Sequence, residues 1–160
     1  NCDGVVIGIL NPDGTIDQKR CAELIALANT LPVSFHRAFD MSNDMSLALE
    51  DLIALGIVRV LSSGGANSAI QGAATLAQLV KQANGRISIM PGAGINNNNI
   101  QDLIEISGAD TFHASCKTYV SSKMIFRNSE TKMGSIDDEY QYELTNIDHV
   151  KALVHIINHS

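Results

Sequence analysis

Polar residues that could take part in binding or catalysis gather in four short clusters of the sequence. The clusters span residues 36–40, 62–65, 91–94 and 113–116. An imidazole at the mouth of a pocket can act as a general acid or base near neutral pH, and a guanidinium can bind a carboxylate or a phosphate. His36 and Arg37 therefore predict either a reactive pocket or a structural histidine beside an ion pair between Arg37 and Asp40.

Two of these clusters are rich in glycine. Their candidate ligand-binding residues are Ser63, Gly64, Gly65, Gly92 and Gly94. Glycines between a strand and a helix let backbone N–H groups approach an anion, which the helix dipole also favours. Either loop alone is explained by a tight turn. Taken together with Arg37 and Ser115, the loops make a site for a small anionic molecule as reasonable an interpretation as two tight turns.

The last cluster contains a candidate metal site. His113 and Cys116 stand three positions apart, and imidazole and thiolate are ligands that suit a soft ion such as Cu(I). They supply only two ligands. The cysteines at positions 2, 21 and 116 are odd in number and far apart, which is typical of free thiols in a reducing compartment, so we expect a cytoplasmic protein.

The elements that would position these clusters recur roughly every 26 residues. Expected strands span 5–10, 33–36, 59–62, 87–90 and 111–114. Amphipathic helical patterns lie between them, with Asp17, Asp44 and Ser68 as expected N-caps and glycines after the helices. This order predicts parallel strands with right-handed crossovers, so each polar cluster falls at the carboxyl end of a strand, where ligands bind in such folds.

The strand pattern favours a barrel over an open doubly wound sheet. Central strands of a doubly wound sheet are covered on both faces and are continuously apolar. Here Val33 and Phe35 alternate with Ser34 and His36, so one face is apolar and the other is small or polar. Five strands are too few to close a barrel of the usual eight-stranded size.

We expect a single domain over residues 1–160, with an irregular segment at 117–146 and a terminal helix at 147–159. The formal net charge of −6 and the dispersed Lys and Arg residues argue against a nucleic-acid partner. The sequence has no apolar run of about 18 residues or more, so we expect no membrane partner.

At the same clusters the sequence resembles the CutC copper homeostasis family, over residues 3 to about 134. The resemblance rests on residues 3–8, 35–41, 59–65, 85–87, 90–92 and 113–115, with further similarity at 126–128 and 133–134. The His-Arg-Ala-Phe-Asp stretch at 36–40 is its most specific motif. Two departures are Ala93, where the family usually has a third glycine, and Ser62, where it often has threonine.

The resemblance implies a TIM-type (β/α)8 barrel of which this chain is the fourth to eighth units, with the first three missing. It also implies copper homeostasis, with copper, as Cu(I), bound or carried in the cytoplasm, or also in the nucleus of a eukaryote. It implies no settled reaction. The residues themselves favour a different alternative, a barrel enzyme acting on a small phosphorylated or carboxylated metabolite, over a thiolate-rich copper carrier. A truncated, non-functional fragment is the third alternative.

An incomplete barrel leaves strand edges and apolar faces exposed, and such surfaces promote association. We therefore expect a homo-oligomer.

Overall fold

A four-stranded parallel sheet forms the centre of the structure, a computed structural model that describes residues 2–128, 130–131 and 138–159. Its strands are β1 (Val5–Ile7), β2 (Val33–Phe35), β3 (Arg59–Ser62) and β4 (Ser88–Pro91), paired in chain order. The helices that follow them are α1 (Gln18–Ala28), α2 (Met45–Ala54), α3 (Ala73–Ala83) and α4 (Ile100–Ser107). The expected α/β architecture with parallel strands is confirmed.

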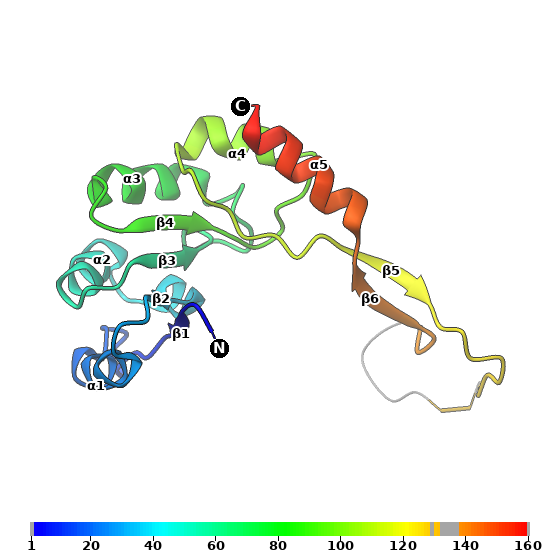
Figure 1. Cartoon of the computed structure of the whole chain (residues 1–160), viewed down its shortest axis with the longest axis horizontal. Helices are drawn as coiled ribbons and strands as arrows, with labels where there is room; N and C mark the ends of the chain where they lie inside the picture. The colour runs from blue at the N-terminus through cyan, green and yellow to red at the C-terminus, as the bar shows by residue number, and fades with distance from the viewer. Residues whose placement is uncertain (1, 129, 132–137, 160) are drawn as a thin grey trace.

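The curved sheet is covered by helices on one face only (Figure 1). The outer face carries Phe35, Val60 and Ile89, which are at most 3% exposed and pair across neighbouring strands. The opposite face, called the inner face below, is open. It is formed by Val6, Ser34, Arg59, Leu61, Ser88 and Met90.

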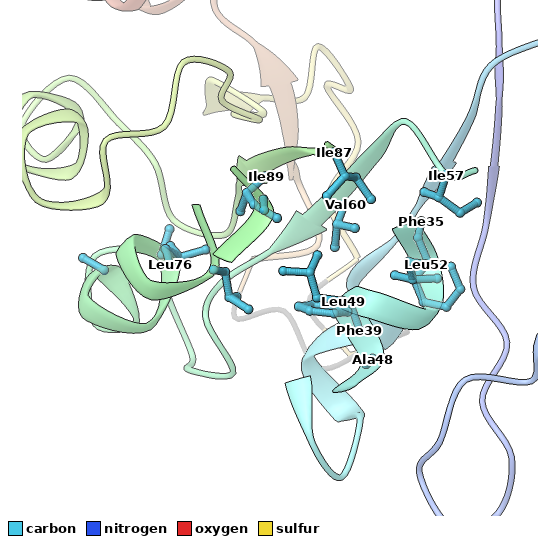
Figure 2. Close-up of a cluster of buried hydrophobic side chains, with 14 of the residues drawn as sticks. Phe35, Phe39, Ala48, Leu49, Leu52, Ile57, Val60, Leu76, Ile87 and Ile89 are labelled. Atoms are coloured by element: carbon cyan, nitrogen blue, oxygen red, sulfur yellow. The ribbon is translucent and has the colours of Figure 1, made fainter. Parts of the chain in front are cut away.

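The hydrophobic core lies between the outer face and the helices (Figure 2). On α2, Leu49 and Leu52 are fully buried against the sheet, and Asp44 caps the helix by accepting from the N–H groups of Ser46 and Leu47. Burying one such leucine contributes about 1.5–3 kcal/mol. The one-faced pattern of α2 therefore marked the two leucines that the sheet buries.

The start of α3 differs from the sequence expectation. Ser68 does not cap the helix, which begins five residues later at Ala73 with Gly72 before it and no side-chain cap. The loop between is tied to the next strand, because the N–H of Ala69 donates to the carbonyl of Ala93 (3.0 Å). Gly72 then packs so closely that a Cβ there would lie 1.9 Å from the carbonyl oxygen of Ser63.

The segment 111–114 is not a full strand, contrary to expectation. It makes one parallel bridge, in which His113 opposes Gly92 and donates to the carbonyl of Pro91 (2.9 Å). The chain then turns away from the sheet at Cys116, whose φ is +49°. The sheet therefore continues beyond β4 for one residue only.

The expectation of irregular structure over 117–146 is wrong for two stretches. Strands β5 (Lys117–Ser121) and β6 (Gln141–Thr145) pair antiparallel and form an arm that projects from the body (Figure 1). Both are largely exposed, so no buried stripe marked them in the sequence. Residues 129 and 132–137, including the similarity noted at 133–134, lie outside the described part.

Helix α5 (Ile147–Asn158) follows the arm and packs beside α4 (Figure 1). The side chain of Asn146 caps it by accepting from the N–H groups of Asp148 and His149, and Leu153 is buried. The terminal helix expected at 147–159 is therefore present. No helix among the described residues is long and apolar enough to cross a membrane.

Candidate functional site

Asp40 lies at the centre of the polar network at the carboxyl end of the sheet. It belongs to a 3-10 helix, η1 (Arg37–Met41), that follows β2 directly. Its Oδ1 accepts from Ser62 Oγ (2.6 Å) and from the N–H of Gly65 (3.2 Å), and its Oδ2 accepts from Arg37 Nε (2.7 Å). The Asp40 side chain is only 5% exposed, so this network holds a buried carboxylate.

The loop after β3 was a candidate to bind an external anion or a simple tight turn, and its N–H donors already bind groups of the protein itself. The N–H of Ser63 donates to both oxygens of Asp40 (3.1 and 3.0 Å), and the N–H of Gly64 donates to Ser62 Oγ (2.9 Å). With Gly65 also engaged, the protein's own carboxylate occupies the position of the ligand. This loop therefore serves to anchor η1 to β3.

The environment lowers the pKa of Asp40. Burial acts to raise the pKa, but hydrogen bonds from Ser62, Arg37 and the N–H groups of Ser63 and Gly65 outweigh it. Asp40 therefore stays ionised at neutral pH, and it neutralises the guanidinium beside it.

Arg37 reaches from η1 across the end of β3. Its Nη2 donates to Ser63 Oγ (2.7 Å) and to the carbonyl of Ala66 (3.4 Å), while its side chain remains 43% exposed. The ion pair with Asp40 that the sequence predicted is present. Its Nη1 donors have no acceptor among the described residues, which leaves that end of the guanidinium available.

His36 is held against the backbone of β1 and its loop. A Cβ built at Gly8 would lie 2.0 Å from the ring, so only glycine leaves room for the imidazole there. The ring Nδ1 accepts from the N–H of Ala38 (3.0 Å). In the neutral ring the proton is therefore on Nε2, which leaves His36 one ring N–H donor.

The loop after β4 keeps free donors. No described residue accepts a hydrogen bond from the N–H groups of Ala93, Gly94 or Ile95. Ala93 has φ +87°, a conformation that costs a side-chain-bearing residue about 1–2 kcal/mol. Of the two expected anion loops, this is the one that retains binding capacity.

A cavity of about 250 Å³ joins this loop to Arg37 and the following segment. It is lined by Arg37, Leu61, Ala93, Gly94, Ile95, His113, Ala114 and Ser115. The structure thus brings Arg37, Gly94, His113 and Ser115 together, as the sequence suggested. His36 and Asp40 lie outside the lining, as do Ser63, Gly64, Gly65 and Gly92.

Cys116 lies apart from this cavity. It borders two other hollows, one with Asn96 and His149 and one with Phe112 and Leu153. The described residues contain no group of three or more His, Cys, Asp or Glu side chains arranged to hold a metal. His113 and Cys116 therefore remain a two-residue candidate.

Two contributors were absent from the predicted site. Ser62 donates to Asp40 and accepts from Gly64, and Gly8 makes room for His36. The signal for Ser62 was its position as the last residue of a strand directly before a glycine loop. Gly8 followed the first strand in the same way.

Comparison with known proteins identifies the family of this chain. A profile of the CutC family matches residues 1–118. This chain belongs to the CutC family. A mouse protein named copper homeostasis protein cutC homolog is 47% identical over 153 residues, which are 94% of this chain and 56% of the mouse protein. A CutC family protein from Vibrio cholerae is 49% identical over 160 residues, covering 98% of this chain and 63% of that protein.

A solved CutC structure supports the fold. The crystal structure of CutC from Streptococcus agalactiae matches this chain with a TM-score of 0.66 and 34% identity, over 69% of this chain and 55% of that one. The chain thus spans between about half and two thirds of the CutC proteins it matches here.

Proposed function

We propose that this chain acts in copper homeostasis. The observation that carries the proposal is its 47% identity, over 94% of its length, to a mouse protein named for that role. Copper is then the cargo of the protein. The three cysteines are free thiols, which supports a reducing, cytoplasmic location.

We further propose that Cu(I) contacts Cys116, with His113 as the second ligand considered. Cys116 is partly buried and borders two hollows, whereas Cys21 is fully buried and burial raises the pKa of its thiol. A thiolate is the form that binds soft metals, so Cys21 is disfavoured as a ligand. Cys2 is exposed and makes a suitable control.

An anaerobic Cu(I) competition titration with a chromophoric chelator tests this site. We expect one equivalent bound by the wild-type chain, with binding lost in Cys116→Ser, weakened in His113→Ala and kept in Cys2→Ser. Circular dichroism of each variant controls for unfolding. Binding that survives in Cys116→Ser, or that is lost only in Cys2→Ser, would exclude this site.

A second candidate function, from a different class, is binding of a small phosphorylated or carboxylated metabolite as the substrate of an enzyme. It is favoured by the cavity of about 250 Å³, where Arg37 Nη1 and the N–H groups of residues 93–95 are free to bind oxygens. His113 and Ser115 line the same cavity and are its candidate reactive groups.

Thermal shift with inorganic phosphate and with acetate tests this candidate. We expect millimolar phosphate to raise the melting temperature of the wild-type chain, as any ligand of the native state does. Ser115→Ala should reduce the shift without altering the Arg37–Asp40 pair. Equal shifts from phosphate and chloride would remove the anion pocket and leave copper binding to stand alone.

We also propose that the sheet is part of a closed (β/α)8 barrel of which this chain forms the fourth to eighth units. The support is the curved sheet with helices on one face only, and the match to 55% of the solved CutC chain (Figure 1). A chain unable to fold by itself would instead favour the third alternative, a non-functional fragment.

Homo-oligomer formation through the β5–β6 arm completes the proposal. Ile125 and Phe126, beyond β5, are 97% and 72% exposed, and Tyr119 on β5 is 64% exposed. Consecutive apolar residues this exposed are typical of an interface. Sedimentation velocity should detect concentration-dependent association that Ile125→Ser with Phe126→Ser abolishes, whereas a monodisperse wild-type monomer would refute it.

A further inference from the structure

Arg59 is a charged residue on the inner face of the sheet for which the described residues supply no partner. It begins β3, and the strand register aligns it with Ser34 of β2 and Ser88 of β4. Its Nε is shielded from solvent and has no hydrogen-bond acceptor. The neighbouring Ser88 hydroxyl bonds with Thr111 Oγ1 (2.8 Å) instead.

The other arginines of the described chain all have partners. Arg20, Arg37 and Arg86 pair with Asp17, Asp40 and Glu50 at 2.6–2.7 Å, and Arg127 lies over the ring of Tyr140. No described carboxylate lies within ion-pair distance of Arg59. A buried donor that makes no hydrogen bond carries the full desolvation penalty of its group, and that penalty is larger for a charged group.

The row of residues around Arg59 is otherwise apolar or neutral. Val6, Ser34, Arg59 and Ser88 face one another across the four strands, and Val6 is 66% exposed. Leu61 and Met90 form the next row and are half-buried. The inner face is therefore an incompletely covered surface of apolar and neutral polar residues with one positive charge that no described carboxylate pairs.

We propose that the inner face docks a polypeptide segment that places a carboxylate against Arg59. The occupant to which we commit is the part of the CutC fold that this chain does not match, which is 37–44% of the curated relatives by difference from the shares covered. This inference rests on the proposed barrel and adds the chemistry of its closure.

The charge of the face argues against a second copy of this chain as the occupant. Two identical inner faces meeting about a two-fold axis would place Arg59 near the partner's Arg59, and like charges repel. None of the inner-face residues is acidic, so a second inner face would offer Arg59 no carboxylate either. A carboxylate is the acceptor that a guanidinium binds in bidentate geometry.

Co-expression of this chain with the unmatched residues of the Vibrio cholerae relative tests the proposal. The variant is Arg59→Met, which keeps most of the side-chain volume and removes the charge. We expect a wild-type 1:1 complex, and association weakened roughly 100-fold or more by Arg59→Met, because the incoming carboxylate is then left buried without a partner.

The isolated chain should respond with the opposite sign. Without its partner, Arg59→Met removes an unsatisfied charge and should raise the melting temperature by roughly 2–4 °C. The matched control is Arg86→Met, which breaks the outer pair with Glu50. It should lower the melting temperature and leave the association unchanged.

Each remaining outcome counts against the proposal. Equal association of wild type and Arg59→Met would exclude the proposed pairing of Arg59 with a carboxylate, but not the proposed barrel. A lower melting temperature of the isolated Arg59→Met chain would have the same meaning. Absence of any wild-type complex would overturn the docking and the barrel together. None of these results bears on copper binding, which the Cu(I) titration tests separately.

Discussion

Ser63 donates to the carboxylate of Asp40 through its backbone N–H (3.0 Å), and its hydroxyl lies 3.0 Å from the same oxygen while making a shorter contact, 2.6 Å, with the carbonyl of Ala66. Asp40 follows β2 and Ser63 follows β3, so this contact joins the ends of two strands 23 residues apart. A strand-end loop that resembles an anion site is in fact occupied by an internal anion.

Removing the charge of Asp40 should therefore be costly. Asp40→Asn loses the ion pair with Arg37 and leaves at least one N–H of the β3 loop without an acceptor. We expect the free energy of unfolding to fall by about 2–4 kcal/mol. Urea denaturation measures it. The control Asp51→Asn removes an exposed charge and keeps an oxygen that can accept from Gln18, so it should stay within about 0.5 kcal/mol of wild type.

Stability should decline in acid below about pH 4.5. The pKa of Glu50 is lowered from 4.5 to about 2 by hydrogen bonds from Arg86 and Gln82, and that of Asp40 is also lowered. The unfolded chain then binds more protons than the folded one between pH 4.5 and 2, so stability present above this range is lost as the pH falls. Glu50→Gln should flatten the profile of melting temperature against pH, and an unchanged slope would contradict this.

A methyl group at Gly8 should displace His36. Gly8→Ala places a Cβ 2.0 Å from the ring, and overpacking of this kind costs about 1–3 kcal/mol. The double variant with His36→Ala removes the clash, so part of the loss should be recovered. A double-mutant cycle in urea measures the coupling, and strictly additive effects would show that the ring does not press on Gly8.

Relief of backbone strain at Ala93 should stabilise the chain. Ala93→Gly removes the Cβ from a residue at φ +87°, which should stabilise the folded chain by about 1–2 kcal/mol. The greater freedom of glycine in the unfolded chain offsets roughly 0.4–1 kcal/mol of this stabilisation. We expect a net gain of up to about 1.5 kcal/mol. Ala109→Gly, at a buried position without a positive φ, should instead destabilise.

Features that depend on neighbours in sequence could be predicted, and those that depend on distant contacts could not. The caps at Asp17 and Asp44 and the alternation of Val33 with Ser34 were readable because each involves residues within one turn or one strand. The start of α3 was missed because the contact of Gly72 with Ser63 comes from the fold.

The candidate site followed the same division. Its cavity residues were found because parallel strands bring their carboxyl ends to one edge. The binding of Asp40 by the β3 loop was not predicted, because sequence spacing does not show that this carboxylate lies against the loop and takes the place of an external anion. Strands β5 and β6 escaped because a hairpin exposed on both faces has no apolar period.

The β5–β6 arm leaves the body through two adjoining joints. Asn146 donates through its N–H to the carbonyl of Cys116 (2.8 Å), and Thr145 Oγ1 donates to the carbonyl of Ser115 (3.3 Å), a residue on the rim of the cavity beside Arg37. The root of the arm and the rim of the cavity therefore share a residue, so a change that displaces Ser115 reaches the arm and the cavity at once.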